Sequence, residues 1–213
     1  MTIKERIATF TSAYPYMSMR LVSEDKVGMI PKVTTDYLDM KIVYTINVTD
    51  CEERKNLPYG NKIVYVTPML LEQWGITEGI LYREITAKME KDNDLLLMNL
   101  MEMMNKFMGS PVSTDINPDD PIVVTNSENV FGATNIILPE VQKRIFHILG
   151  SGYFILPSSV HEVIILRDDI MHVHDMLSMV REINAEIVDE YDKLSDNIYH
   201  YNPITNMITV YNN

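Results

Sequence analysis

Imidazole and carboxylate side chains gather in the second half of the chain, around a short Pro-Ser-Ser turn. His161 and Glu162 follow that turn closely, and His172 and His174 lie farther along. Such side chains are ligands that zinc, iron and nickel accept. Residues two apart on a helix point in different directions, however, so His172 and His174 do not readily share one ion. We therefore predict no metal and no cofactor, and keep His161, His172 and His174 only as ligand candidates for an alternative function.

The same turn carries serines that could act as nucleophiles beside a histidine. Ser158 or Ser159 with His161 would form such a pair, yet the sequence lacks the Gly-x-Ser-x-Gly elbow that exposes a catalytic serine. Hydrogen bonding within a tight turn explains the serines better, so we expect one of them to bond the backbone or the segment at His161 and Glu162. No catalytic residue is predicted, and Ser159, His161 and Glu162 stay the candidates for such a role.

The single cysteine, Cys51, lies among the carboxylates of Asp50, Glu52 and Glu53. Nearby negative charge disfavours the reactive thiolate, so we expect no catalytic cysteine. One cysteine cannot form an internal disulfide, which favours a reducing compartment. Because the sequence shows no apolar run of membrane-spanning length and no secretory signal, we expect a cytoplasmic protein without a membrane partner.

Methionine is concentrated in one part of the chain, at residues 98–108, which hold five of its 16 methionines. Methionine fills irregular gaps in cores and also makes adaptable contact surfaces. Two interpretations stay open: a buried core helix, or an apolar docking face beside the loop that follows. In the second interpretation the binding residues are Met101, Met104 and Met108, together with Asp119 and Asp120 of that loop.

Net charge excludes one class of partner and favours another. Its 18 lysines and arginines face 30 aspartates and glutamates, which leaves a net charge of −12. Binding to nucleic acid needs a basic footprint, so we expect no direct nucleic-acid partner. An acidic protein is instead drawn to a basic protein surface. We predict a non-enzymatic acidic protein-binding module, such as an inhibitor that docks on a basic, nucleic-acid-binding partner. The alternative is a metal-dependent hydrolase that uses His161 and Glu162, and the oligomeric state stays open.

The spacing of hydrophobic residues and the positions of turn residues predict the strands and helices that hold these side chains. Strands are predicted at residues 7–10, 37–46, 63–66, 122–125, 133–138, 153–156, 163–166, 198–201 and 207–211. Helices are predicted at residues 69–74, 77–89, 95–107, 139–149 and 170–191. Trp74 ends the first of these helices, and we expect it to be largely buried as an anchor of the core around it.

The order of these elements predicts an α+β fold with mainly antiparallel sheets packed on helices. A length of 213 residues permits two domains. The stretch at residues 111–120 is rich in proline and aspartate and reads as a linker. We therefore expect two modules of similar size, at residues 1–110 and 121–213.

Two segments of the chain resemble a family of bacterial domains of unknown function. The first runs from the strand at residues 63–66 through Trp74-Gly75-Ile76-Thr77 to Leu81-Tyr82. The second runs from Thr125-Asn126 through Gly132-Ala133 and continues with Tyr153-Phe154-Ile155-Leu156-Pro157-Ser158-Ser159-Val160-His161-Glu162-Val163. Residues 180–184 and 194–199 are similar to the family as well, whereas the first 30 residues and the methionine-rich helix depart from it. The resemblance implies a fold and a domain extent over residues 35–201, but no activity.

Overall fold

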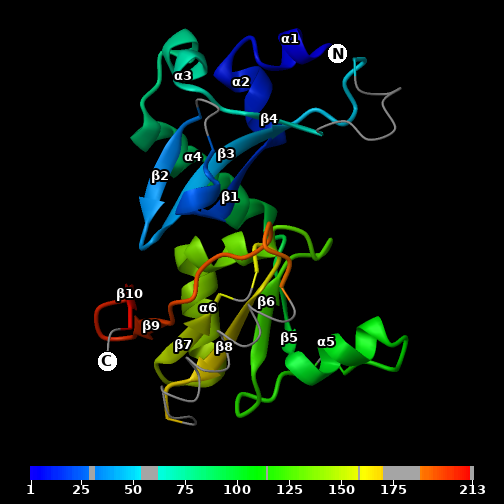
Figure 1. Ribbon diagram of the computed structural model, residues 1–213, viewed down its shortest axis with the longest axis vertical. Coiled ribbons are helices and arrows are strands. Elements are labelled where there is room, and N and C mark those ends of the chain that lie inside the picture. Colours follow the sequence, from blue (N-terminus) through cyan, green and yellow to red (C-terminus); the bar gives the residue numbers. More distant parts are fainter. Residues whose placement is uncertain (29–31, 54–61, 114, 158, 170–187, 212–213) are drawn as a thin grey trace. The chain divides into compact units, whose positions relative to one another are not determined.

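The chain forms two compact units (Figure 1). The computed structural model describes residues 1–28, 32–53, 62–113, 115–157, 159–169 and 188–211. The first unit contains Met1–Tyr37 and Lys41–Asp92, and the second contains Leu38–Met40 and Asn93–Asn213. Helices packed with antiparallel sheets make up the fold, so the predicted α+β class is confirmed. The chain passes from the first unit to the second after Asp92, so residues 111–120 belong to the second unit.

The first unit is built on a four-stranded sheet. Strand β3 (Met40–Asn47) lies between β1 (Met17–Ser23) and β2 (Thr34–Tyr37), and it also pairs antiparallel with β4 (Ile63–Tyr65). Helix α4 packs against β1 through its buried apolar stripe. The helical elements described in this unit are α1 (Ile3–Arg6), α2 (Phe10–Ala13), α3 (Pro68–Trp74), α4 (Glu78–Asp92) and the 3-10 turns η1 (Tyr14–Tyr16) and η2 (Glu24–Lys26).

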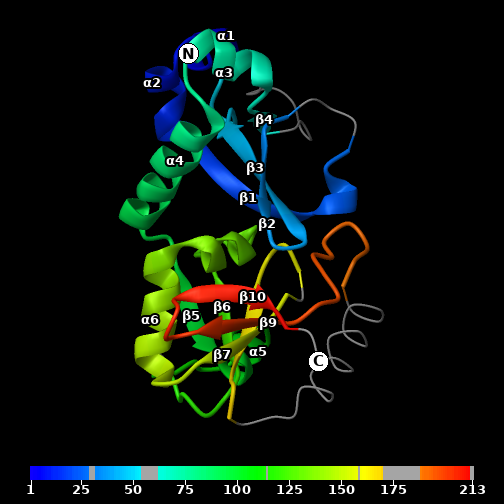
Figure 2. The same ribbon diagram turned by 90° about the vertical axis from the view of Figure 1, so that its left-hand side faces the viewer.

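The second unit is built on a six-stranded antiparallel sheet in the order β10-β9-β7-β8-β6-β5. Figure 2 shows the β9–β10 hairpin at one edge of this sheet. Its strands are β5 (Leu96–Asn99), β6 (Ile122–Thr125), β7 (Tyr153–Leu156), β8 (Val163–Arg167), β9 (Tyr199–Asn202) and β10 (Met207–Val210). The helical elements described in this unit are α5 (Leu100–Phe107), α6 (Pro139–Leu149) and the 3-10 helix η3 (Gly132–Ile137).

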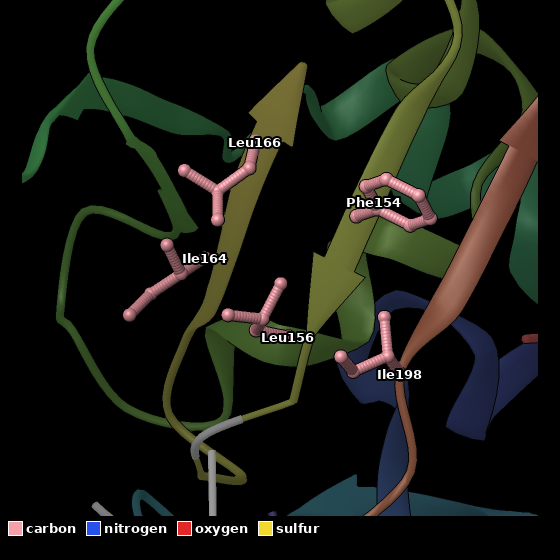
Figure 3. Close-up of a cluster of buried hydrophobic side chains, with 5 residues drawn as sticks. All are labelled: Phe154, Leu156, Ile164, Leu166 and Ile198. Atoms are coloured by element: carbon pink, nitrogen blue, oxygen red, sulfur yellow. The ribbon is translucent and has the colours of Figure 1, made fainter. Parts of the chain in front are cut away.

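Both faces of the central strands of this sheet are buried. On one face Tyr153 of β7 donates its hydroxyl to the carbonyl of Gln142 in α6, at 3.3 Å. Successive residues of a strand point to opposite faces, so Phe154 lies on the other side. Figure 3 shows the buried cluster on that side, which consists of Phe154, Leu156, Ile164, Leu166 and Ile198. Burial on both faces explains the nearly continuous apolar runs of these strands.

Elements with strong local signals form where the sequence predicts them. The β-branched run at residues 122–125 forms β6, and the runs at 153–156 and 163–166 form β7 and β8. Helix α6 begins at Pro139, whose missing N–H costs nothing in the first turn. It ends at Gly150, whose φ of 71° is a left-handed conformation that glycine adopts without strain.

Two predictions in the second unit are wrong. A strand is predicted at residues 133–138, but residues 133–137 belong to the 3-10 helix η3, which is buried throughout. A short, continuous apolar run has no hydrophobic periodicity that distinguishes a strand from a helix, so the sequence pattern alone could not assign this segment. Residues 95–107, predicted as one helix, form strand β5 followed by helix α5, because residues 96–99 pair with β6. Pairing with a distant strand overrides the local helical preference.

Two further predictions fail in the first unit. The strand expected at residues 7–10 is absent, because Thr9 caps helix α2 by accepting a hydrogen bond from the backbone N–H of Ser12. Trp74 is only partly buried: its indole N–H donates to the Ile7 carbonyl at 3.0 Å, and its ring lies 5.8 Å from that of Phe10. Most of the helix predicted at residues 170–191 lies outside the described residues.

Candidate functional site

Helix α5 is carried by the connection between the two paired strands β5 and β6. The strands meet in antiparallel register, with Asn99 opposite Ile122, and the backbone N–H of Leu100 donates to the carbonyl of Pro121 at 2.8 Å. The connection is therefore closed at its base by the sheet. In Figure 1 helix α5 stands beside the edge strand β5, away from α6. The sheet thus presents this helix at the surface.

The methionines of α5 divide between two faces of the helix. Met103 is 7% exposed and faces inward. Met101, Met104 and Met108 are 64%, 50% and 68% exposed. Met101 and Met104 lie in α5, and Met108 directly follows it as its C-terminal cap. Residues spaced by three and four positions lie on one side of a helix, so these three form a single stripe, which we call the methionine face. The buried core helix, one of the two interpretations of these methionines, therefore holds for Met103 and not for the exposed three.

The loop that follows α5 folds back along the helix. The backbone N–H of Ser113 donates to the Glu102 carboxylate at 2.8 Å. Farther along, the N–H of Asn117 donates to the side-chain oxygen of Asn99 at 2.8 Å, and the Asn99 amide donates to the Asn117 carbonyl at 2.9 Å. Asn99 directly precedes α5 and is buried, so this pair of bonds ties the loop to the N-terminal end of the helix.

This fold-back places the acidic candidates on the same connection as the methionine face. Asp119 accepts a hydrogen bond from the guanidinium of Arg167 at 2.7 Å. Asp120 accepts one from the side-chain amide of Asn117 at 2.8 Å. Arg167 also contacts Asp169, at 2.6 Å, so a single positive charge is shared by two carboxylates. The neighbourhood of the loop therefore stays negative.

The turn at Ser159 is held by hydrogen bonds among its own residues. The buried Ser159 hydroxyl donates to the Glu162 carboxylate at 2.8 Å and accepts the backbone N–H of His161 at 3.0 Å. The Thr125 hydroxyl of β6 donates to the His161 carbonyl at 2.9 Å. The turn bonding expected for these serines is therefore present at Ser159, while Ser158 lies outside the described residues. The hydroxyl bonds a carboxylate, and no bond joins it to the imidazole of His161.

The imidazole of His161 has a partner at each nitrogen. Its Nδ1 lies 3.3 Å from the backbone nitrogen of Phe131, which donates to it, and its Nε2 lies 3.3 Å from the Asp192 carboxylate. Because Nδ1 accepts a hydrogen bond, a neutral ring carries its proton on Nε2, the nitrogen that lies near the Asp192 carboxylate. The Phe131 ring packs beside the imidazole at 5.6 Å. This arrangement fixes the ring and engages both nitrogens.

The other histidine candidates do not join His161 in the described part of the chain. His172 and His174 lie outside the described residues. Across the residues that the structure does describe, no three His, Cys, Asp or Glu side chains are placed to hold one metal ion. None of the described helices is long and apolar enough to cross a membrane.

A comparison with known protein families matches residues 3–203 to a family of unknown function, DUF5688. The chain belongs to this family. The match spans both compact units and covers every candidate residue described above, in agreement with the resemblance to an uncharacterised family. No curated protein and no solved structure matches the chain.

Sequence reasoning missed a second polar cluster inside the second unit, centred on Asp39. Its carboxylate accepts hydrogen bonds from Ser195 at 2.7 Å, from Asn197 at 2.9 Å and from the Tyr199 hydroxyl at 2.5 Å. Burial alone would raise the pKa of Asp39, but the three donors outweigh it and lower that pKa below its usual value. No local pattern marks the cluster, because its partners lie 156 to 160 residues away along the chain.

Proposed function

We propose that this chain is a non-enzymatic, acidic protein-binding module that docks on the basic surface of a partner protein. The observation that carries the proposal is the methionine face of α5, three exposed apolar side chains on one side of an anchored helix. Methionine is flexible and polarisable, so such a surface adapts to varied partner side chains.

The exposure of this face is costly unless a partner covers it. Full burial of one methionine side chain contributes about 1.5 to 3 kcal/mol. Given the exposed fractions of Met101, Met104 and Met108, roughly 3 to 5 kcal/mol is left unrealised in the isolated chain. Met103 on the same helix is buried, so a methionine side chain can gain this stabilisation within this unit. A docking partner would recover the difference.

Charge supports the basic character of the partner. The chain carries a net charge of −12, which repels nucleic acid and draws a basic protein surface toward it. An inhibitor that competes with nucleic acid for such a surface is one form that the proposal takes. The lone cysteine fits a reducing compartment, so we propose that this happens in the cytoplasm.

The alternative, a metal-dependent hydrolase that uses His161 and Glu162, has less support from the geometry. His161 would have to give up the Phe131 N–H or Asp192 to bind an ion, and Glu162 would have to release Ser159. Elemental analysis of the purified protein tests this alternative. A stoichiometric metal that disappears in His161→Ala would favour the hydrolase over the binding module.

Site-specific photo-crosslinking tests the proposed binding function. A photoreactive amino acid replaces Met104, and the same replacement at Met69, which is 73% exposed on α3 of the first unit, serves as the control. In an extract of the source cells we expect position 104 alone to cross-link to a basic protein. The yield should fall as salt rises from about 0.1 M to about 0.5 M, because screening shortens the reach of the charges. Equal cross-linking from both positions, or a yield that ignores salt, would overturn the proposal.

A further inference from the structure

The backbone of α5 limits how a partner can bind the methionine face. At the C-terminal end of the helix, the N–H groups of Met108, Gly109 and Ser110 already bond the carbonyls of Met104, Lys106 and Asn105. Added-strand recognition requires a row of free backbone donors and acceptors, which an α-helix does not offer along its side. Recognition on this face therefore rests on side chains.

The spacing of the three methionines matches the contact pattern of packed helices. Met101, Met104 and Met108 follow positions i, i+3 and i+7, which is the spacing of the apolar seam along which two helices pack. The stripe is about 10 Å long, from the rise of 1.5 Å per residue, and so spans about two turns of a facing helix. Unbranched thioether side chains also adjust to the uneven surface of such a partner.

The charges on the connection between β5 and β6 indicate which charges the facing helix should carry beside its apolar stripe. Residues 100–121 carry four carboxylates, at Glu102, Asp115, Asp119 and Asp120, against one lysine, Lys106. The loop that holds three of these carboxylates folds back along α5 through the bonds of Asn99 with Asn117. The connection that carries the methionine face is therefore net negative, which favours a partner element with positive charge.

We infer that the occupant of the methionine face is a cationic amphipathic helix of the partner protein. Its apolar stripe packs on Met101, Met104 and Met108, and its lysines or arginines lie toward the acidic loop. The inference rests on the proposed binding function and adds the shape and the charge pattern of the partner element. The apolar contact requires a partner helix with an apolar stripe, and the acidic loop requires positive charge beside that stripe.

A designed peptide tests this inference on the full chain. The probe is an amphipathic leucine–lysine peptide of about 18 residues, long enough to form a helix on binding. One control peptide has the same composition in an order without a helical stripe, and a second has glutamate in place of lysine. Met101, Met104 and Met108 are changed together to glutamine, and Met207→Gln, at a residue 59% exposed on β10 of the same unit, is the matched control.

We expect the leucine–lysine peptide to bind with a gain of helical circular dichroism. Its dissociation constant should rise at least about tenfold in the triple variant and less than about twofold in Met207→Gln. The reordered and the acidic peptides should each bind at least about tenfold more weakly than the probe.

Equal binding of the ordered and reordered peptides would overturn the inference of a helical partner. So would an unchanged dissociation constant in the triple variant, or a dimer of this chain that the triple variant dissolves. In those cases salt-sensitive cross-linking from position 104 to a basic protein still supports the proposed function, whereas loss of that cross-link refutes the proposed function itself.

Discussion

The Asp39 cluster makes the sharpest prediction about stability in the second unit. Its carboxylate receives hydrogen bonds from Ser195, Asn197 and Tyr199. Ser195 and Tyr199 are buried, Tyr199 to 1% exposure, whereas Asn197 is exposed and can turn to water. Asp39→Ala therefore removes two hydrogen bonds that water does not replace. We expect the free energy of unfolding to fall by about 2 to 3 kcal/mol.

The lowered pKa of Asp39 also predicts how its contribution to stability depends on pH. The pKa of Asp39 is lowered in the folded protein, so its contribution is fully present above the unfolded value of about 3.9. The contribution is lost as pH falls through the lower, folded pKa. The difference between wild type and Asp39→Ala should therefore be constant at neutral pH and shrink in strong acid.

Urea unfolding followed by circular dichroism measures this difference. Asp36→Ala is the control, because Asp36 is exposed on β2, and its loss should change stability by less than about 0.5 kcal/mol. A double-mutant cycle of Asp39→Ala with Tyr199→Phe should show a coupling of about 1 kcal/mol. The reasoning is refuted if Asp39→Ala costs no more than Asp36→Ala, or if its cost is as large at pH 2 as at pH 7.

Three further changes test other parts of the structure. Gly132→Ala should destabilise by about 3 kcal/mol or more, because the added Cβ would lie 2.4 Å from Oγ1 and 2.7 Å from Cα of Thr125. Gly79→Ala, in α4 with no atom within 4 Å of the added Cβ, should stabilise by about 0.5 kcal/mol, and thermal unfolding compares the two. Ser159→Ala should cost about 1 to 2 kcal/mol in urea unfolding through the lost bonds to Glu162 and to the turn backbone; a loss of function without a loss of stability would contradict that structural role. Free DNA and RNA should show no measurable binding in a gel-shift assay at physiological salt, and tight binding would refute the charge argument.

The parts of the fold that could be predicted are those specified by adjacent residues. Strand β6 is a run of β-branched residues, and α6 begins at Pro139 and ends before Gly150. Each of these signals acts within a few positions along the chain, so the sequence alone displays it.

The parts that could not be predicted depend on residues far away. Residues 96–99 become strand β5 only because β6 pairs with them. The Asp39 cluster joins residues from opposite ends of the chain, and His161 meets Asp192 across the same unit. The helical spacing of Met101, Met104 and Met108 was visible in the sequence, but whether that stripe faces the core or solvent is decided by packing.

The polar residues of one candidate site stabilise the fold, whereas the apolar residues of the other are exposed to solvent. We propose binding rather than catalysis for this reason. Catalysis needs a nucleophile and a base within reach of each other, with the base free to take a proton. At the Ser159 turn the hydroxyl donates to Glu162, and both nitrogens of His161 have partners, so these groups stabilise one another. At α5 the apolar side chains, which stabilise a protein by leaving water, are held in contact with it on an anchored helix. The partner proposed above would cover the methionine face and remove these side chains from water.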